Sequence, residues 1–190
     1  MRNISRTKFS ILLIAAVFVM LCAGSSITMA QDVATGSATA TVVTQLTVAA
    51  SSPLAFGTVY QGVPTTISKN VADAAVFDIT GQANADLLLY LSLPEFLATA
   101  TGDDRMVVTF ASTDLDIDTA LVGAGDPAAF VGGWQGEDPY KPMGVAGGDP
   151  CLGDAGLCAL FLGGTVVPTL DQTAGAYTGD IVLTVAYQGT

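Results

Sequence analysis

The chain has 190 residues, 17 of them acidic and six basic, which gives a formal net charge of −11, and it contains no histidine. This charge repels nucleic-acid phosphates and anionic membrane surfaces. The lack of histidine removes the commonest general base and a favoured ligand of zinc and copper. Composition therefore argues against nucleic-acid binding and against triad or metallohydrolase chemistry. We expect a protein that is not an enzyme and uses no cofactor.

Residues 1–30 have the layout of a secretory signal peptide. Three cations precede an apolar run at 9–21, and Thr28-Met29-Ala30 places small residues before Gln31. The run is shorter than the ~20 apolar residues that a membrane-spanning helix needs. We expect cleavage before Gln31, export from a bacterial cell, and no membrane insertion of the mature chain. That chain keeps only Lys69, Arg105 and Lys141 as cations.

The first half of the mature sequence predicts short strands separated by turns. Residues 39–49 alternate and are rich in Val and Thr, and residues 54–60 follow a Ser-Ser-Pro turn, with Gly57 as a candidate bulge. Residues 65–71 are expected to form a polar, partly exposed strand. Residues 74–80 place Phe77 and Ile79 on one face, which we expect to point inward.

Further strands are predicted on both sides of an irregular segment. After a turn at 81–84, residues 87–93 are almost continuously apolar, which is typical of a strand covered on both faces. Residues 106–112 alternate. The segment 113–156 is long, acidic and rich in Gly and Pro, with one candidate strand near 128–134. The final strands are expected at 157–167 and 177–187, the last at the rim of a sheet.

These seven to nine strands predict one domain, residues 31–190, with the immunoglobulin-like architecture of a two-sheet β-sandwich. No convincing helix is found. Residues 31–43 are small and polar at their start, and we interpret them as an extended N-terminal arm outside the core.

Two cysteines remain after the predicted cleavage, Cys151 and Cys158. In an oxidising compartment, an isolated pair at this separation is typical of a small structural disulfide. A redox pair would more usually have the spacing Cys-x-x-Cys. We expect a bridge that closes a Gly-rich loop.

The strongest candidates for a binding site are acidic and aromatic residues in the 113–156 segment. Asp114, Asp116 and Asp118 alternate and could offer oxygen ligands to calcium. The alternative is a strand or loop whose acidic face meets solvent while the residues between them pack. Trp134, near Tyr140, could stack on a sugar ring. It could equally close one end of the core.

Several motifs resemble a known family. In chain order, these motifs are Leu54-Ala55-Phe56-Gly57, Phe77-Asp78-Ile79-Thr80-Gly81-Gln82-Ala83-Asn84, Leu93-Pro94, Leu162-Gly163-Gly164-Thr165 and Ala174-Gly175-Ala176-Tyr177-Thr178-Gly179, with a terminal strand that ends at Tyr187. This set resembles the bacterial secreted domain of unknown function 4402. That family is similar to the major pilins of the Mat/Ecp common pilus and, more distantly, to spore coat protein U and chaperone-usher fimbrial subunits.

The resemblance implies a pilin-like sandwich that lacks an edge strand and receives one from a neighbouring subunit. The donor would be the N-terminal arm, residues 32–43, and the acceptor groove would run beside the terminal strand. The donor side chains would be Val33, Ala34, Ala38, Ala40 and Val42, and the acceptor side chains Ile181, Leu183, Val185 and Tyr187. The implied partners are other copies or other fibre subunits, with a periplasmic chaperone and an usher in a Gram-negative cell.

The sequence therefore favours two functions. The first is a secreted structural subunit that assembles by β-strand pairing into a fimbria-like surface fibre or coat. The second is a monomeric adhesion or binding module for a glycan or calcium. A hydrolase ranks third because the chain has no histidine and no Gly-x-Ser-x-Gly motif.

Overall fold

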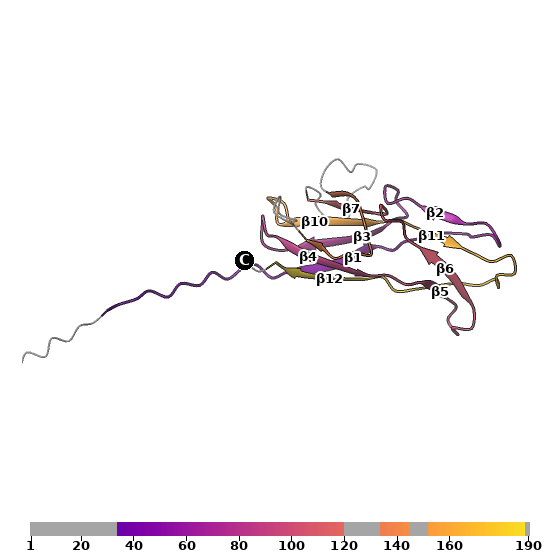
Figure 1. Cartoon of the computed structure of the whole chain (residues 1–190), viewed down its shortest axis with the longest axis horizontal. Helices are drawn as coiled ribbons and strands as arrows, with labels where there is room; N and C mark the ends of the chain where they lie inside the picture. Colours follow the sequence, from indigo (N-terminus) through magenta and orange to yellow (C-terminus); the bar gives the residue numbers. More distant parts are fainter. Residues whose placement is uncertain (1–33, 120–133, 145–151, 189–190) are drawn as a thin grey trace, which may run out of the picture. The chain divides into compact units, whose positions relative to one another are not determined.

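The computed structural model describes residues 34–119, 134–144 and 152–188. The chain divides into two units, Met1–Thr41 and Val42–Thr190. In the first unit, the described residues 34–41 are exposed and form no helix or strand. In the second, the described residues form twelve β-strands and no helix, so the all-β prediction is confirmed (Figure 1). The predicted signal peptide, residues 1–30, lies outside the described residues.

The strands form three antiparallel sheets. The largest has five strands in the order β1-β3-β10-β7-β8. Its strands are β1 (Thr47–Ser52), β3 (Ala75–Thr80), β10 (Leu157–Leu162), β7 (Leu115–Asp118) and β8 (Trp134–Glu137). In this sheet β1 pairs with β3 and stands at the edge.

A four-stranded sheet has the order β2-β11-β6-β5, and a three-stranded sheet has the order β12-β4-β9. The four strands are β2 (Thr65–Ile67), β11 (Gly164–Val167), β6 (Arg105–Thr109) and β5 (Phe96–Ala98). The three are β12 (Val182–Tyr187), β4 (Leu87–Ser92) and β9 (Met143–Gly144). The terminal strand β12 pairs with β4 at the rim of its sheet, as predicted.

Alternate side chains from all three sheets meet in a common hydrophobic core. Phe77 and Ile79 of β3 point into it, as their alternation predicted, and Leu160 of β10 joins them. The three-stranded sheet contributes Leu89, and the four-stranded sheet contributes Val108. An all-β chain whose sheets share one core in this way is compatible with a β-sandwich. The sheets number three among the described residues, where the sequence predicted two.

Strand β4 differs from its prediction. The apolar run at 87–93 was expected to be buried on both faces, but β4 alternates between buried and exposed residues. Leu89 is 0% exposed, whereas its neighbour Leu88 is 49% exposed. The prediction was wrong because β4 belongs to a sheet whose outer face is open to solvent, and antiparallel sheets tolerate this.

This alternation makes adjacent leucines a matched pair for mutation. We expect Leu89→Ala to lower the free energy of unfolding by about 2–5 kcal/mol, because it removes core contacts and leaves a cavity. Leu88→Ala should cost under about 1 kcal/mol, because its side chain is already half in water. Urea denaturation of the two variants measures both values. Equal losses would contradict the burial pattern of β4.

Other strands also differ from their predicted boundaries. The strand expected at 39–49 begins only at Thr47, and β2 is shorter than the predicted 65–71. The segment 54–60 forms no strand, and its Gly57 has a φ of 63°, in the left-handed region. Strand β5 was not predicted. In the segment 113–156, the described residues form three short strands, β7, β8 and β9, and the strand expected near 128–134 lies almost wholly outside the described residues.

The predicted strand 157–167 is split between two sheets. Its first part, β10, pairs in the five-stranded sheet, and its second part, β11, pairs in the four-stranded sheet. The break falls at Gly163, where an added Cβ would lie 2.5 Å from the carbonyl oxygen of Ile67 and 2.7 Å from the amide nitrogen of Lys69. Glycine permits this close approach of two backbones, so the chain can cross from one sheet to the other.

Candidate functional site

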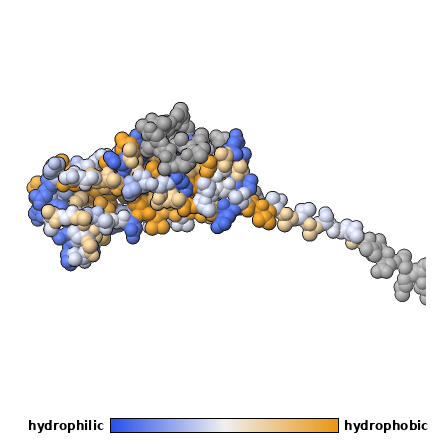
Figure 2. Space-filling view, turned by 180° about the vertical axis from the view of Figure 1, so that it is seen from behind, coloured by the Kyte–Doolittle hydropathy of each residue, from blue (hydrophilic) through white to orange (hydrophobic). Residues whose placement is uncertain are grey.

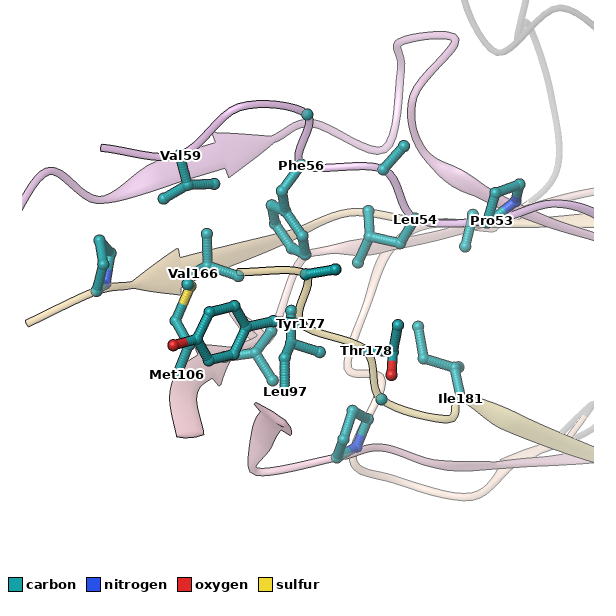
Figure 3. A pocket seen from close by; sticks show the side chains of 18 of the residues that line it. Pro53, Leu54, Phe56, Val59, Leu97, Met106, Val166, Tyr177, Thr178 and Ile181 are labelled. Carbon is teal, nitrogen blue, oxygen red and sulfur yellow. The ribbon is translucent and has the colours of Figure 1, made fainter. Parts of the chain in front are cut away.

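A cavity of about 810 Å³ opens between two segments of the 42–190 unit (Figure 3). One wall is the chain that leaves β1, from Ala50 to Gln61, and the other is the chain that leads into β12, residues 173–181. Strands β3, β5, β6 and β11 contribute floor residues. We call this space the edge cavity.

The first wall of the edge cavity is apolar. Leu54, Phe56 and Val59 are half-buried and pack against the hydrophobic core. Figure 3 shows Leu54 and Phe56 on one side of the cavity, with Tyr177 and Ile181 on the other. Apolar side chains that are only half covered can still bury area against an incoming apolar group.

The second wall is held by hydrogen bonds of a buried glutamine. Gln172 Nε2 donates to the hydroxyl of Tyr177 at 2.7 Å and to the carbonyl oxygen of Arg105 at 3.2 Å. The Tyr177 hydroxyl in turn donates to the carbonyl oxygen of Thr173 at 2.7 Å. These hydrogen bonds tie the second wall to the backbone of β6 and to itself.

The two walls are not joined by backbone pairing. The amide of Ala55 donates to the carbonyl oxygen of Asp73 at 2.9 Å, and Thr178 pairs with Ala98 in both directions at 2.8 Å. Across the residues that the structure describes, no backbone hydrogen bond joins 53–61 to 174–181. The cavity therefore separates two segments whose backbones are each anchored to other parts of the fold.

The two strands next to the edge cavity, β1 and β12, each present an open edge. In the described part of the chain, β1 is hydrogen-bonded only to β3, and β12 only to β4. An open edge is a row of unpaired N–H and C=O groups that can pair with another strand. Figure 2 shows apolar side chains gathered near the middle of the face seen there. An apolar cavity beside open strand edges can receive an extended peptide, by backbone pairing and by side-chain burial.

The predicted acceptor residues lie on the inward face of the terminal segment. Ile181, Leu183, Val185 and Tyr187 are half-buried and pack against the core. Of these four, Ile181 lines the edge cavity. Among the predicted donor residues, Ala34, Ala38, Ala40 and Val42 are exposed, and Val33 lies outside the described residues.

The three alternating aspartates are not equivalent. Asp114 Oδ2 accepts a hydrogen bond from the amide of Ala111 at 2.8 Å, as a turn residue does. Leu115 and Ile117 are buried, as the structural alternative predicted. The same alternative expected the acidic face to meet solvent. This expectation is wrong, because Asp116 and Asp118 are buried too.

Asp116 is held by a cation and a backbone amide. Lys69 Nζ lies 2.7 Å from Asp116 Oδ1, and the same oxygen accepts a hydrogen bond from the amide of Gly136 at 2.7 Å. Within the described ranges, no three or more His, Cys, Asp or Glu side chains come together in a way that could hold a metal ion. The structure gives Asp116 the role of an ion-pair partner across the fold.

The remaining candidates are only partly described. Cys158 is buried, and Cys151 lies outside the described residues, so the disulfide stays a prediction. Tyr140 is exposed and meets Phe110 edge to face at 6.2 Å between ring centroids. Nearby, Lys141 donates a hydrogen bond that lowers the pKa of Asp138 below its usual range, and the backbone amide of Tyr140 adds to the effect.

Comparison with protein-family models, with curated proteins and with solved structures found no match for this chain. The site defines the protein as an all-β molecule with an apolar cavity beside open strand edges. Sequence reasoning missed most of that cavity, including Leu97 and Met106 of its floor. The available signal was the alternation of Leu54 and Phe56 with smaller residues. We interpreted this alternation as a strand, but the two side chains form part of the first wall of the edge cavity.

Proposed function

We propose that this protein is a secreted structural subunit with a pilin-like, immunoglobulin-like sandwich. It assembles by β-strand pairing into a fimbria-like fibre or coat on a bacterial surface and catalyses no reaction. The observation that carries the proposal is the edge cavity, an apolar space of about 810 Å³ beside the open edges of β1 and β12. Self-contained domains usually protect such edges. Two open edges beside an apolar cavity suit a fold that is completed by another chain.

The occupant is the N-terminal arm of a second copy, residues 31–43. In β-strand addition, main-chain hydrogen bonds supply affinity and alternate side chains fill pockets. Ala38, Ala40 and Val42 alternate along the arm, so in an extended chain they share one face. Alanine and valine bury little apolar area, at about 25 cal/mol per Å². Hydrogen bonds of the backbone therefore carry most of the affinity, and assembly depends on protein concentration.

A chaperone or another fibre subunit with larger alternate residues would bind the same cavity more tightly.

The sequence supports the extracellular setting. A leader with the layout of a signal peptide precedes a chain that keeps three cations against 17 acidic residues. Such a charge favours solubility outside the cell. A disulfide between Cys151 and Cys158 would suit the same compartment.

The test uses mature protein from Gln31 and the same protein without residues 31–43. Size-exclusion chromatography and electron microscopy should detect assemblies of the first protein and monomers of the second. Assembly that is unaffected by the deletion defeats the proposal. A protein that stays monomeric at all concentrations also defeats it, and calcium calorimetry and a glycan array then test the alternative of a binding module.

A matched pair of charged variants sharpens this experiment. Ala38→Asp with Ala40→Asp places two carboxylates on the face of the arm that enters the apolar cavity. Ser37→Asp with Thr39→Asp adds the same charge to the opposite face. We expect the first pair to prevent assembly and the second to leave most of it, because an unpaired charge is costly to bury in an apolar site. Equal effects would mean that net charge, and not insertion, controls assembly.

A further inference from the structure

Three separate segments meet at the hydroxyl group of Tyr187, the last residue of β12. This hydroxyl accepts a hydrogen bond from the amide of Gln82 at 2.7 Å and donates one to the carbonyl oxygen of Thr44 at 2.6 Å. The side chain of Gln82 completes the set, because its Oε1 accepts a hydrogen bond from Thr44 Oγ1 at 3.2 Å. Tyr187, Gln82 and Thr44 thus link the chain before β1, the β3–β4 turn and the end of β12. We call these three residues the Tyr187 clamp.

Gly81 and Leu46 lie close to the clamp. A Cβ added at Gly81 would collide with the Tyr187 hydroxyl and would come within 3.1 Å of Leu46 Cδ1. Leu46 is half-buried and packs against the core, whereas Val42 is 93% exposed and Val43 is 51% exposed. The chain therefore becomes fixed to the sandwich at Thr44.

The clamp and the edge cavity lie at opposite ends of β12. Ile181 lines the cavity just before the strand begins, and Tyr187 ends it. Six residues of extended chain span about 20 Å. The arm is therefore joined to the body about 20 Å from the cavity that the arm of another copy would enter.

Length does not prevent the arm from entering its own cavity. Residues 34–41, if extended, span about 26 Å, which exceeds the distance to be covered. If the chain reversed in a two-residue turn at Val42-Val43, Thr41 would face Thr44 and Ala34 would face Ser51, next to the cavity. Such an arm would pair with the open edge of β1. The question is whether residues 41–44 can make that turn.

The sequence at the clamp opposes this turn. Residues 41–44 read Thr-Val-Val-Thr, and all four are β-branched. Two-residue hairpin turns need positive φ and favour Asn-Gly, Asp-Gly or Gly-Gly. A β-branched residue with positive φ is a genuine outlier. Because Thr44 is also held by the clamp, the reversal cannot be moved closer to β1 without breaking hydrogen bonds.

We propose that the Tyr187 clamp and the β-branched run 41–44 together direct the N-terminal arm away from its own edge cavity and into that of a second copy. Tyr187 acts as a positioning residue in this arrangement. A contact between the arm of one copy and the cavity of the next joins different surfaces, so it generates an open chain unless the rotation closes a ring. This inference rests on the proposed function.

The first test introduces a turn. Mature protein with Val42→Asn and Val43→Gly carries the preferred hairpin sequence, and Val43→Thr alone, which keeps a β-branched residue and leaves the donor side chain Val42 in place, is the control. We expect wild type and control to assemble and the Asn-Gly variant to remain monomeric in size-exclusion chromatography with light scattering. Its unfolding midpoint should exceed that of protein lacking residues 31–43, because its own arm pairs with the open edge of β1. If wild type and the Asn-Gly variant assemble equally, this inference is overturned and the proposed function stands. A monomeric wild type overturns both.

The second test removes the clamp hydroxyl. Tyr187→Phe keeps the ring against the core and loses both hydrogen bonds. We expect the monomer fraction at a fixed concentration to rise about fivefold to tenfold, which is the effect of about one net hydrogen bond. Thr184→Ser, on the outer face of the same strand, is the control. A lower unfolding midpoint with an unchanged monomer fraction would reduce Tyr187 to a structural residue and overturn its positioning role.

Discussion

Replacing Ile181 with aspartate is expected to abolish assembly of the mature protein, while Val182→Asp leaves it nearly unchanged. Ile181 is half-buried and lines the edge cavity, whereas Val182 is exposed on the outer face of β12. A carboxylate at position 181 must be desolvated when an apolar strand arrives, and it finds no cationic partner in that strand. A carboxylate at position 182 stays in water. The two neighbours receive the same charge but face opposite sides of the chain.

The measurement is the apparent dissociation constant of assembly, obtained from chromatography over a range of concentrations. We expect Ile181→Asp to weaken it by at least about a hundredfold, which corresponds to about 2.7 kcal/mol. Circular dichroism and thermal unfolding of both variants check that each monomer is folded. Assembly of Ile181→Asp at wild-type concentrations would show that the edge cavity is not the acceptor.

Lys69→Met is expected to lower the free energy of unfolding by about 3–5 kcal/mol, because it leaves a buried carboxylate without its cation. Lys69 Nζ lies 2.7 Å from Asp116 Oδ1, and the two side chains are 17% and 4% exposed. The same ammonium group donates to the carbonyl oxygen of Thr113 at 2.5 Å. Lys69 therefore joins the chain after β2 to strand β7, which belongs to another sheet.

A second substitution separates the charge from the packing. In the double variant Lys69→Met with Asp116→Asn, no uncompensated charge remains, and an amide oxygen can still accept the Gly136 amide. We expect the double variant to be more stable than Lys69→Met alone, as measured by urea denaturation. Lys141→Met is the surface control, because its pair with Asp138 is exposed and such pairs contribute about 0–1 kcal/mol. Equal losses for Lys69→Met and Lys141→Met would contradict a buried role for Lys69.

The sequence predicted the strands whose alternation is clear. Phe77 and Ile79 point inward as expected, the turn after Thr80 is present, and the chain reaches β12 at a sheet edge. These features can be predicted from local sequence. In a strand with one buried face, side chains alternate between inward and outward with a period of two residues. The same rule explains the error at β4. The run is leucine at every position except Tyr90 and Ser92, and these two residues were too weak a mark of the exposed face to separate Leu88 from Leu89.

The candidate site was less accessible to sequence reasoning. The edge cavity combines Leu54 and Phe56 with Leu97, Met106 and Tyr177, which come from distant parts of the chain. Ile181 was identified because the terminal strand was expected to border a groove. The role of Asp116 was missed for a similar reason, since its partner Lys69 is 47 positions away and nothing local links them.

By itself, the sequence determined the all-β class of this protein, its acidic and histidine-free chemistry, and the inward faces of its alternating strands. These properties follow from composition and from a two-residue period, and both can be read without knowing which strands are neighbours. The tertiary structure alone decided that β1 also stands at a sheet edge, where the apolar cavity lies, and that Tyr187 holds Thr44. Each of these depends on pairing between segments distant in sequence, and pairing is chosen by the packing of the whole core.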